Sequence, residues 1–174
     1  MTALDGQFDV LCDVAQAFRT GGIPFWLRGG WALDFLMGEV RTGHADMDLV
    51  AWRSDRDLIC DTLSQHHFQL DNELPEVAID FTKSGHWVQV LLMEVSATGA
   101  LVCHGFESWP FPEGSLDGPA RTLNGLTCHT LAPHALLDEK ESYEAMRGRP
   151  LREKDRVSKR LLRQLMKGEA DELP

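Results

Sequence analysis

The feature that constrains this chain most is a pair of glycines between an apolar run and a short helical pattern. The apolar run covers residues 24–27, and Gly29 and Gly30 precede a helical pattern over residues 31–37 that ends at Gly38. The run predicts a strand, and glycines after a strand let the backbone turn and approach a ligand closely. Free N–H groups at a helix N-terminus favour a bound anion such as phosphate. The segment therefore predicts a strand, a bend and a helix suited to cradle a phosphate group.

Two aspartates begin the next predicted strand. Asp46 and Asp48 open residues 46–52, a segment that alternates at first and then becomes continuously apolar. Side chains two residues apart on a strand share a face, so the two carboxylates repel each other unless a cation or a shared proton resolves the conflict. Carboxylate oxygens suit Mg²⁺ or Mn²⁺, which also bind waters and substrate phosphates. For so short a motif, the alternative to a metal site is a polar turn at the start of a strand. The position of the two aspartates after the glycine pair favours a metal site beside a phosphate cradle.

Both motifs match a known group of enzymes. The run GGWALD (29–34), followed by RTGHADMDLV (41–50), resembles the small aminoglycoside and lincosamide nucleotidyltransferases of the DNA polymerase β-like superfamily. In that group a Gly-Gly-Trp-x-x-Asp segment precedes His-x-Asp-hydrophobic-Asp, in the same order and spacing. Residues 131–155 also resemble the later helix and the Arg-Pro and Lys-Asp stretch of the group. The likeness extends from about Ile23 to Leu165.

The resemblance implies a fold, a reaction and cofactors. The fold would be α+β, the polymerase β-like nucleotidyltransferase fold, in which helices flank a mixed β-sheet and a helical pair forms the C-terminus. The reaction would transfer a nucleoside monophosphate from ATP or another nucleoside triphosphate to a hydroxyl group, with two Mg²⁺ ions. Ions held by Asp46 and Asp48 would bridge the triphosphate and stabilise the departing pyrophosphate. A positioned carboxylate would serve as base for the acceptor hydroxyl.

One position departs from the pattern of the group. The superfamily supplies a third carboxylate from a later strand, and here Gln89 stands where that aspartate belongs. Glutamine can coordinate a metal through its carbonyl oxygen, but it brings no charge and cannot act as a base. Glu94 is one replacement, although a regular strand places it on the opposite face from Gln89. A hairpin closed by residues 84–85 puts Asp80 directly opposite Gln89, which favours Asp80 as the substitute ligand or base.

Further candidates for the nucleotide site surround these motifs. Arg28 and Arg41 flank the glycine pair and are placed to contact phosphate oxygens, with a solvated surface position as the alternative. His44 precedes the aspartate pair and is expected to orient that loop. Lys140, on a later helical face, is either a contact for the triphosphate or a solvated lysine. Asp34 is expected to cap its helix or to hold an arginine.

The remaining elements follow from hydrophobic periodicity and from turn residues. Helices are predicted over residues 5–19 (closed by Gly21-Gly22), 55–66 (with Ser54 as N-cap), 133–146 and 153–167. Pro150 separates the last two helices. Strands are predicted over 77–82 and 87–95, joined by a hairpin. Residues 96–130 predict only short strands in irregular surroundings, and we expect acceptor choice to depend on this segment and on the C-terminal helices.

The chain is expected to form one compact unit. A nucleotidyltransferase core is predicted over 1–131, a helical segment packed on it over 132–168, and a frayed tail over 169–174. The four cysteines lack metal or disulfide spacing, which favours a reducing compartment. The N-terminus is acidic where a signal peptide is basic, and no apolar run approaches the roughly 18 residues of a membrane span. These features predict a cytoplasmic protein that does not interact with membranes.

The net charge narrows the choice of partner. Seventeen Lys and Arg against 27 Asp and Glu give a net charge of -10, which repels polyanions and excludes nucleic acid as a general partner. The same field attracts a cationic acceptor, such as an aminoglycoside-like antibiotic, and a lincosamide-like acceptor is the second candidate. Two other functions remain open. One is a catalytically degenerate nucleotide-binding or interaction protein, which Gln89 suggests because it replaces the third carboxylate. The other is a toxin–antitoxin-type nucleotidyltransferase that modifies a protein or a tRNA end. The oligomeric state is left open.

Overall fold

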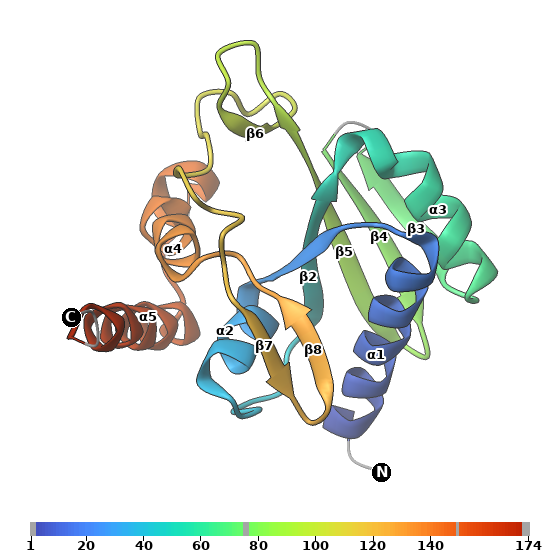
Figure 1. Ribbon diagram of the computed structural model, residues 1–174, viewed down its shortest axis with the longest axis horizontal. Helices are drawn as coiled ribbons and strands as arrows, with labels where there is room; N and C mark the ends of the chain where they lie inside the picture. Colours follow the sequence, from blue (N-terminus) through green and yellow to red (C-terminus); the bar gives the residue numbers. More distant parts are fainter. Residues whose placement is uncertain (1–2, 75–76, 149, 172–174) are drawn as a thin grey trace.

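The computed structural model describes residues 3–74, 77–148 and 150–171, in which five α-helices surround a six-stranded mixed sheet (Figure 1). The strands of the sheet are β1 (Phe25–Arg28), β2 (Asp46–Trp52), β3 (Gln69–Leu74), β4 (Ala78–Lys83), β5 (His86–Val95) and β6 (Leu101–Cys103). The helices are α1 (Ala3–Gly21), α2 (Gly29–Met37), α3 (Arg56–Gln65), α4 (Pro133–Arg147) and α5 (Glu153–Asp171). A short two-stranded sheet is formed by β7 (Ala120–Leu123) and β8 (Leu126–His129).

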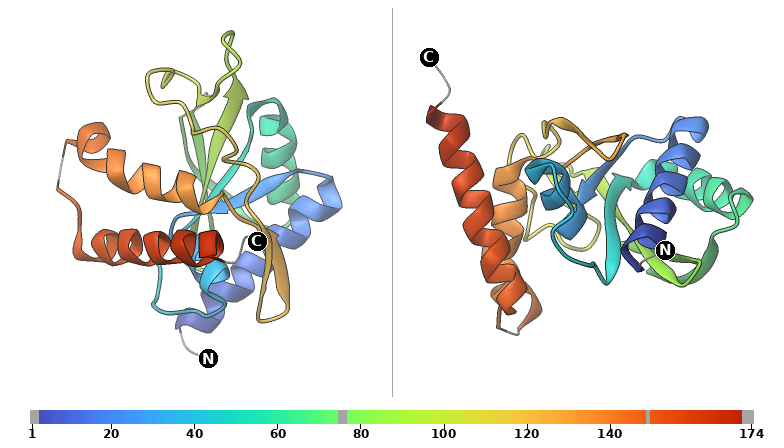
Figure 2. Two further views of the ribbon diagram at one scale, coloured as in Figure 1. Left: turned by 60° about the vertical axis from the view of Figure 1, so that its left-hand side comes forward. Right: turned by 90° about the horizontal axis from the view of Figure 1, so that it is seen from below.

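The strand order of the main sheet is β1-β2-β5-β4-β3, with β6 paired to the far end of β5. Strands β2 and β5 are parallel, whereas the other pairs of this sheet are antiparallel. The predicted α+β fold with a mixed sheet is therefore confirmed. Helices α1 and α3 pack together on one side of the molecule, and α2, α4 and α5 lie on the other (Figures 1 and 2).

The central strands carry most of their core residues on one face. Leu27, Leu49, Val90 and Ile79 are partners in register across β1, β2, β5 and β4, and each is 0% exposed. Successive side chains on a strand point to opposite faces. The residue next to each of these four therefore projects from the other face of the sheet, on which a site can be built.

The structure differs from the expected elements in four places. Helix α2 begins at Gly29 rather than at Trp31, so the glycine pair forms its first two residues instead of a bend before it. Strand β3 was not predicted, because its sequence QLDNEL is mostly polar; as an edge strand it is held by pairing with β4. Helix α3 follows a 3₁₀ turn (Arg53–Asp55), and its N-cap is Asp55, so the Ser54 cap is wrong. Helix α5 continues to Asp171, which makes the first part of the predicted frayed tail helical, while residues 172–174 lie outside the described residues.

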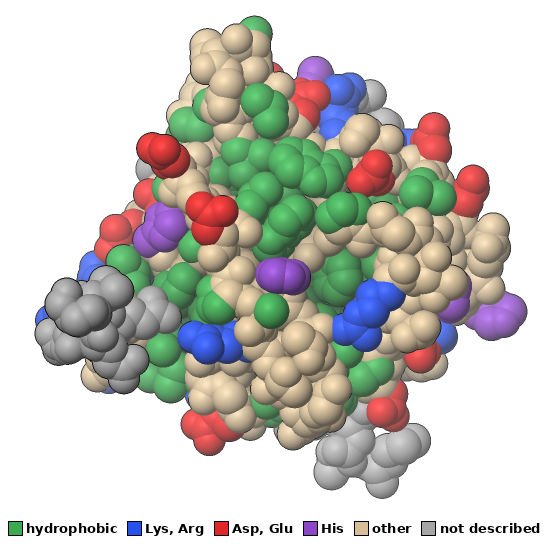
Figure 3. All heavy atoms as spheres, viewed as in Figure 1, with side chains coloured by type: hydrophobic (Ala, Val, Ile, Leu, Met, Phe, Trp, Pro, Cys, Tyr) green, Lys and Arg blue, Asp and Glu red, His purple; other side chains and the backbone are tan. Residues whose placement is uncertain are grey.

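Apolar side chains gather in the upper middle of the face drawn in Figure 3, with acidic and basic side chains around them. In and beside residues 96–130, the large apolar side chains of Val95, Phe106 and Trp109 are exposed. All four cysteines are free thiols. Within the described ranges, no helix combines the length and the apolar character needed to cross a bilayer.

Candidate active site

A row of polar side chains crosses the sheet on the face opposite the apolar core. Arg28 of β1 pairs with Asp48 of β2, Asp48 with Gln89 of β5, and Gln89 with Asp80 of β4. Cross-strand partners lie on the same face, about 4.8 Å apart between neighbouring strands. The register thus confirms that Asp80 stands opposite Gln89, and it puts Gln89 beside Asp48.

A cavity of about 490 Å³ lies over the Arg28 end of this row, a volume typical of small-molecule sites. Its walls come from β1, β2, β5, the start of α2, the loop before β2, α4 and α5. The sequence-predicted site residues in its lining are Arg28, Gly29, Gly30, Arg41, His44, Asp46, Asp48, Gln89 and Lys140. Asp80 is not among the described lining residues, and neither is any residue of 96–130.

The glycine pair leaves room for two side chains of the site. Gly29 has a φ of 65°, and a Cβ atom there would lie 2.1 Å from Oδ2 of Asp48. A Cβ atom on Gly30 would lie 2.3 Å from Nδ1 of His44. Both distances are far below van der Waals contact, so any other residue would displace the carboxylate or the imidazole. The predicted approach of these backbone groups to a phosphate stays a prediction, but the need for glycine at both positions has a steric cause.

Gly29→Ala is expected to lower both the free energy of unfolding and the affinity for a metal–nucleotide complex. The left-handed backbone costs about 1–2 kcal/mol with a side chain. The new Cβ also pushes Asp48 out of place, which we expect to weaken Mn²⁺–nucleotide binding on the order of tenfold. Gly38→Ala is the matched control, because Gly38 has a φ of 76° and open space around its Cβ position. Chemical unfolding and isothermal titration measure the two effects, and equal binding by both variants would contradict the steric explanation.

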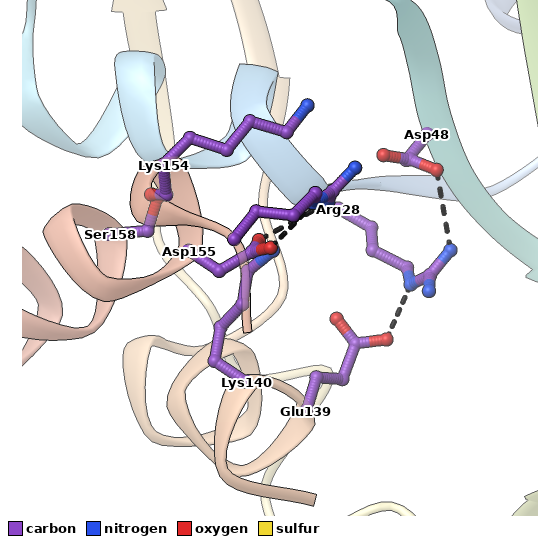
Figure 4. Close-up of polar contacts among 8 residues, drawn as sticks. Arg28, Asp48, Glu139, Lys140, Lys154, Asp155 and Ser158 are labelled. Atoms are coloured by element: carbon purple, nitrogen blue, oxygen red, sulfur yellow. Dashed lines mark hydrogen bonds and ion pairs between the residues drawn. The ribbon is translucent and has the colours of Figure 1, made fainter. Parts of the chain in front are cut away.

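Arg28 joins Asp48 of β2 to Glu139 of α4 (Figure 4). Its Nε donates to Oε1 of Glu139 at 2.5 Å, and its Nη1 lies 3.4 Å from Oδ1 of Asp48. Burial of the guanidinium opposes its charge, but the two carboxylates outweigh burial and raise the pKa of Arg28 above its ordinary value. The side chain is only 18% exposed, so Arg28 is not a solvated surface residue. It reduces the negative charge around Asp48 without enclosing that carboxylate.

Asp46 shows the conflict that the sequence predicts for two adjacent carboxylates. Partial burial, followed by the charge of Asp48, raises the pKa of Asp46, while the nearby charge of Lys154 lowers it in part. A bound divalent cation would resolve the conflict, and the oxygens of Asp46, Asp48 and the Gln89 amide fit the preference of Mg²⁺ or Mn²⁺. Among the described residues, no group of three or more acids, histidines or cysteines is placed to hold a metal. The donor set that the sequence predicts, two carboxylates and one amide, stays a prediction.

A buried aspartate fixes the wall beside the glycine pair. Asp34 of α2 is 0% exposed and accepts from Nε of Arg41 at 3.2 Å, so the expectation that it holds an arginine is confirmed. The other oxygen of Asp34 lies 2.6 Å from Nε2 of His44. The His44 ring also lies against Trp31, with 4.8 Å between ring centroids, and Gln7 donates to its backbone oxygen. The loop before β2 is therefore held from three sides.

The sequence of the chain matches the model of a known family. The model of the aminoglycoside-2''-adenylyltransferase family matches residues 10–162, which is most of the chain. The chain belongs to this family. Its members are nucleotidyltransferase enzymes, as the resemblance of the two motifs implied.

Solved structures of antibiotic adenylyltransferases share the fold of this family member. The solution structure of the antibiotic-resistance factor ANT(2'')-Ia superposes with a TM-score of 0.78 at 18% identity, covering 95% of this chain and 86% of that one. The crystal structure of ANT(2'')-Ia with adenylyl-2''-tobramycin gives 0.76 at 19% identity, with coverage of 95% and 92%. The lincosamide adenylyltransferase LnuA, bound to lincomycin, gives 0.70 at 15% identity, with coverage of 92% and 96%. No curated protein matches the sequence significantly.

In this adenylyltransferase family member, neither acid considered as a substitute for the third carboxylate lines the cavity. Glu94 accepts from Nη1 of Arg53 and lies 2.8 Å from Nδ1 of His104, away from the aspartate pair. Asp80 is two strands from Asp48, about 10 Å between backbones, with Gln89 between them. A cation held by Asp46 and Asp48 would therefore lie nearer to Gln89 than to Asp80, and the role of Asp80 as the substitute ligand or base stays a prediction.

Lys140 is held by an aspartate that joins α4 to α5. Its Nζ donates to Oδ1 of Asp155 at 2.7 Å, and Nε of Arg152 donates to Oδ2 at the same distance. Burial opposes ionisation of Asp155, which is 1% exposed, but the two cations outweigh it and hold its pKa at about 2. The cluster therefore keeps its charges at neutral pH and fixes Lys140 in the cavity wall rather than in solvent.

Six further polar residues of the lining were not singled out from the sequence. One is Thr42, and the other five lie within 139–158: Glu139, Arg152, Lys154, Asp155 and Ser158. Only the general likeness of residues 131–155 to the group pointed to this region. The positions of these five depend on how α4 and α5 pack, because Glu139 and Arg28 meet although 111 residues separate them. The sequence signal for these residues was a set of charged side chains spaced one helical turn apart on each of the last two helices. Helix faces that are simply exposed to solvent show the same pattern.

Proposed function

We propose that this chain transfers a nucleoside monophosphate from a nucleoside triphosphate, ATP or another, to a hydroxyl group of a small cationic antibiotic of the aminoglycoside type. The supporting observation is the cavity that brings the Asp46–Asp48 pair together with the start of α2 and several cations. Mg²⁺, when bound, supplies charge neutralisation at the reacting phosphorus. Family membership supports the reaction class, and the net charge of -10 supports a cationic acceptor.

The triphosphate is proposed to lie between the α2 N-terminus and α5. The described cations of the cavity lining are Arg28, Arg41, Lys140, Arg152 and Lys154. Four of these cations are also paired with carboxylates of the protein. A polyphosphate would bind to the cations together with the backbone N–H groups at the start of α2. Asp46 and Asp48 would hold the metal on the sheet side. Lys154, whose charge acts on Asp46, is a candidate contact for the same phosphates.

Glu139 is proposed as the proton acceptor for the antibiotic hydroxyl. Gln89 cannot accept that proton, and Asp155 is committed to two cations. Glu139 lines the cavity and uses one carboxylate oxygen for Arg28. Glu139→Gln is expected to lower turnover about 100-fold, the lower end of the range for loss of a general base. Nucleotide binding should persist, and full turnover by this variant would remove Glu139 from the mechanism.

A combined binding and turnover experiment tests the function. Isothermal titration with Mg²⁺ and each of the four ribonucleoside triphosphates measures binding, and pyrophosphate release over a panel of aminoglycosides and lincosamides measures transfer. Transfer should require both acceptor and divalent cation and should stop with a chelator. Nucleotide binding without release on any acceptor would instead favour the degenerate nucleotide-binding protein. Label transferred to protein or tRNA, but to no antibiotic, would favour the toxin–antitoxin type.

A further inference from the structure

We propose that Asp80 is a positioning residue that turns the carbonyl oxygen of Gln89 toward the cavity, where it serves as the neutral third ligand of the divalent cation. The inference rests on the proposed function, since the cation is that of the nucleotidyl transfer. It assigns Asp80 a role through Gln89 rather than at the reacting atoms. It also gives a role to the acid on β4 in a chain that has Gln89 at the position of the aspartate expected on β5.

The contact between the two side chains is direct. Nε2 of Gln89 donates to Oδ1 of Asp80 at 2.9 Å, and the two residues are partners in the β4–β5 register. On its other side, Gln89 is in register with Asp48 across the parallel β2–β5 pair. Gln89 lines the cavity, whereas Asp80 stands behind it. The amide is therefore placed between a carboxylate partner and the proposed cation site.

The chemistry of the pair determines which end of the amide faces which neighbour. An ionised carboxylate only accepts hydrogen bonds, whereas an amide has a donor end and an acceptor end. With Asp80 on β4, the NH₂ group of Gln89 must face Asp80. The carbonyl oxygen is left for the opposite side, toward Asp48 and the cavity. Without this partner the amide could rotate and present its NH₂ group, which repels a cation.

The charges of the pair support the same arrangement. Gln89 and Asp80 together carry one negative charge, located one strand farther from Asp46 and Asp48 than the expected acid would be. An acid at both positions would set two carboxylates directly opposite each other, which is unfavourable. The pair thus keeps a donor facing an acceptor. A site with two charged ligands and one neutral ligand should bind its divalent cation more weakly than a site with three acids.

Exchanging the two side chain types tests the inference. Mn²⁺ binding is measured by electron paramagnetic resonance in the presence of the non-hydrolysable analogue α,β-methylene-ATP, and thermal unfolding is measured without ligand. Asp80→Ala should weaken Mn²⁺ binding about tenfold, the lower end for loss of a residue that orients a ligand. Asp80→Asn should retain most of the affinity, because its own carbonyl oxygen still accepts from Gln89. Asn72→Ala, at the next position of the same row on β3, is the control and should leave Mn²⁺ binding unchanged.

The exchange variant gives a result that a merely structural role for Asp80 does not predict. Gln89→Asp alone should lower the unfolding temperature, because it faces Asp80 with a second carboxylate. The double variant Gln89→Asp/Asp80→Asn restores a donor opposite an acceptor with the roles reversed. It should recover the unfolding temperature and bind Mn²⁺ more tightly than the unmodified protein. Mn²⁺ binding by this double variant at or below the unmodified level would overturn the inference.

Two further outcomes separate this inference from the proposed function. Unchanged Mn²⁺ affinity in Asp80→Ala, or equal losses in Asp80→Ala and Asp80→Asn, would overturn the positioning role while the nucleotide site stands. No binding of Mn²⁺ and nucleotide by the unmodified protein would overturn both. Nuclear magnetic resonance of the ligand-free protein adds an independent readout. The side chain amide of Gln89 should show slowed proton exchange that Asp80→Ala removes, and an amide that exchanges freely in the unmodified protein would contradict the contact.

Discussion

Asp48→Asn is expected to lower nucleotidyl transfer at least about 1000-fold while the protein stays folded. Loss of one charged metal ligand removes several kcal/mol of transition-state stabilisation, and each 1.36 kcal/mol is a factor of ten in rate. The fold should persist, because asparagine has nearly the same shape as aspartate and Arg28 keeps Glu139 as its closer partner. The variant also removes the charge of Asp48, which after burial is the second cause of the raised pKa of Asp46. Pyrophosphate release and thermal unfolding measure the two quantities.

Glu94→Gln is the matched control for Asp48→Asn. Both variants replace one acid by its amide on neighbouring strands, but Glu94 contacts Arg53 and His104 outside the cavity. Glu94→Gln should therefore retain transfer activity near that of the unmodified protein. Full activity of Asp48→Asn would remove the metal assignment. A comparable loss in Glu94→Gln would instead show that the site extends to the β6 end of the sheet.

Asp34→Ala is expected to lower the free energy of unfolding by about 3–5 kcal/mol, the range measured when one partner of a buried ion pair is removed. Asp34 is fully buried and binds both Arg41 and His44. Its loss leaves these two side chains without the acceptor that holds the loop before β2. Because that loop carries Asp46 into the cavity, affinity for the metal–nucleotide complex should fall as well. Chemical unfolding and isothermal titration with Mg²⁺ and nucleotide measure both effects.

Asp57→Ala gives the comparison for an exposed ion pair. Asp57 lies 2.7 Å from Arg56, but its side chain is 90% exposed. Water screens such a pair, so its removal should change the unfolding transition little and leave nucleotide binding unchanged. If Asp34→Ala unfolded at the same denaturant concentration as Asp57→Ala, the loop would have to be held mainly by its packing on Trp31 and by Gln7.

The elements predicted correctly are those with a strong local pattern. Helix α1 shows helical spacing of apolar residues, and β2 and β5 show alternation or a continuous apolar run, so their positions agree with expectation to within a few residues. The hairpin between β4 and β5 has Ser84 and Gly85 in its turn, both with positive φ, and the register could be counted outward from them. Strand β3 lacks such a pattern, since an edge strand is stabilised by backbone pairing and buries few apolar side chains.

The role of the glycine pair was only partly visible in the sequence. The position of Gly29 and Gly30 after β1 indicated close approach to another group, and the expected group was a phosphate. In the structure the groups that a side chain would strike are the carboxylate of Asp48 and the ring of His44. The sequence indicates that space is needed next to these two glycines. Which side chains fill that space depends on how β2 and the preceding loop pack against α2.

The sequence by itself determined the family motifs, the α+β class, the shared face of Asp46 and Asp48, and the pairing of Gln89 with Asp80. All of these depend on strand alternation, turn residues or short spacing, which act over a few residues. Only the tertiary structure decided that Glu139 meets Arg28, that Asp155 holds Lys140, and that α4 and α5 form a wall of the cavity. These contacts join distant segments, and they arise from the packing of whole elements, which no local pattern records.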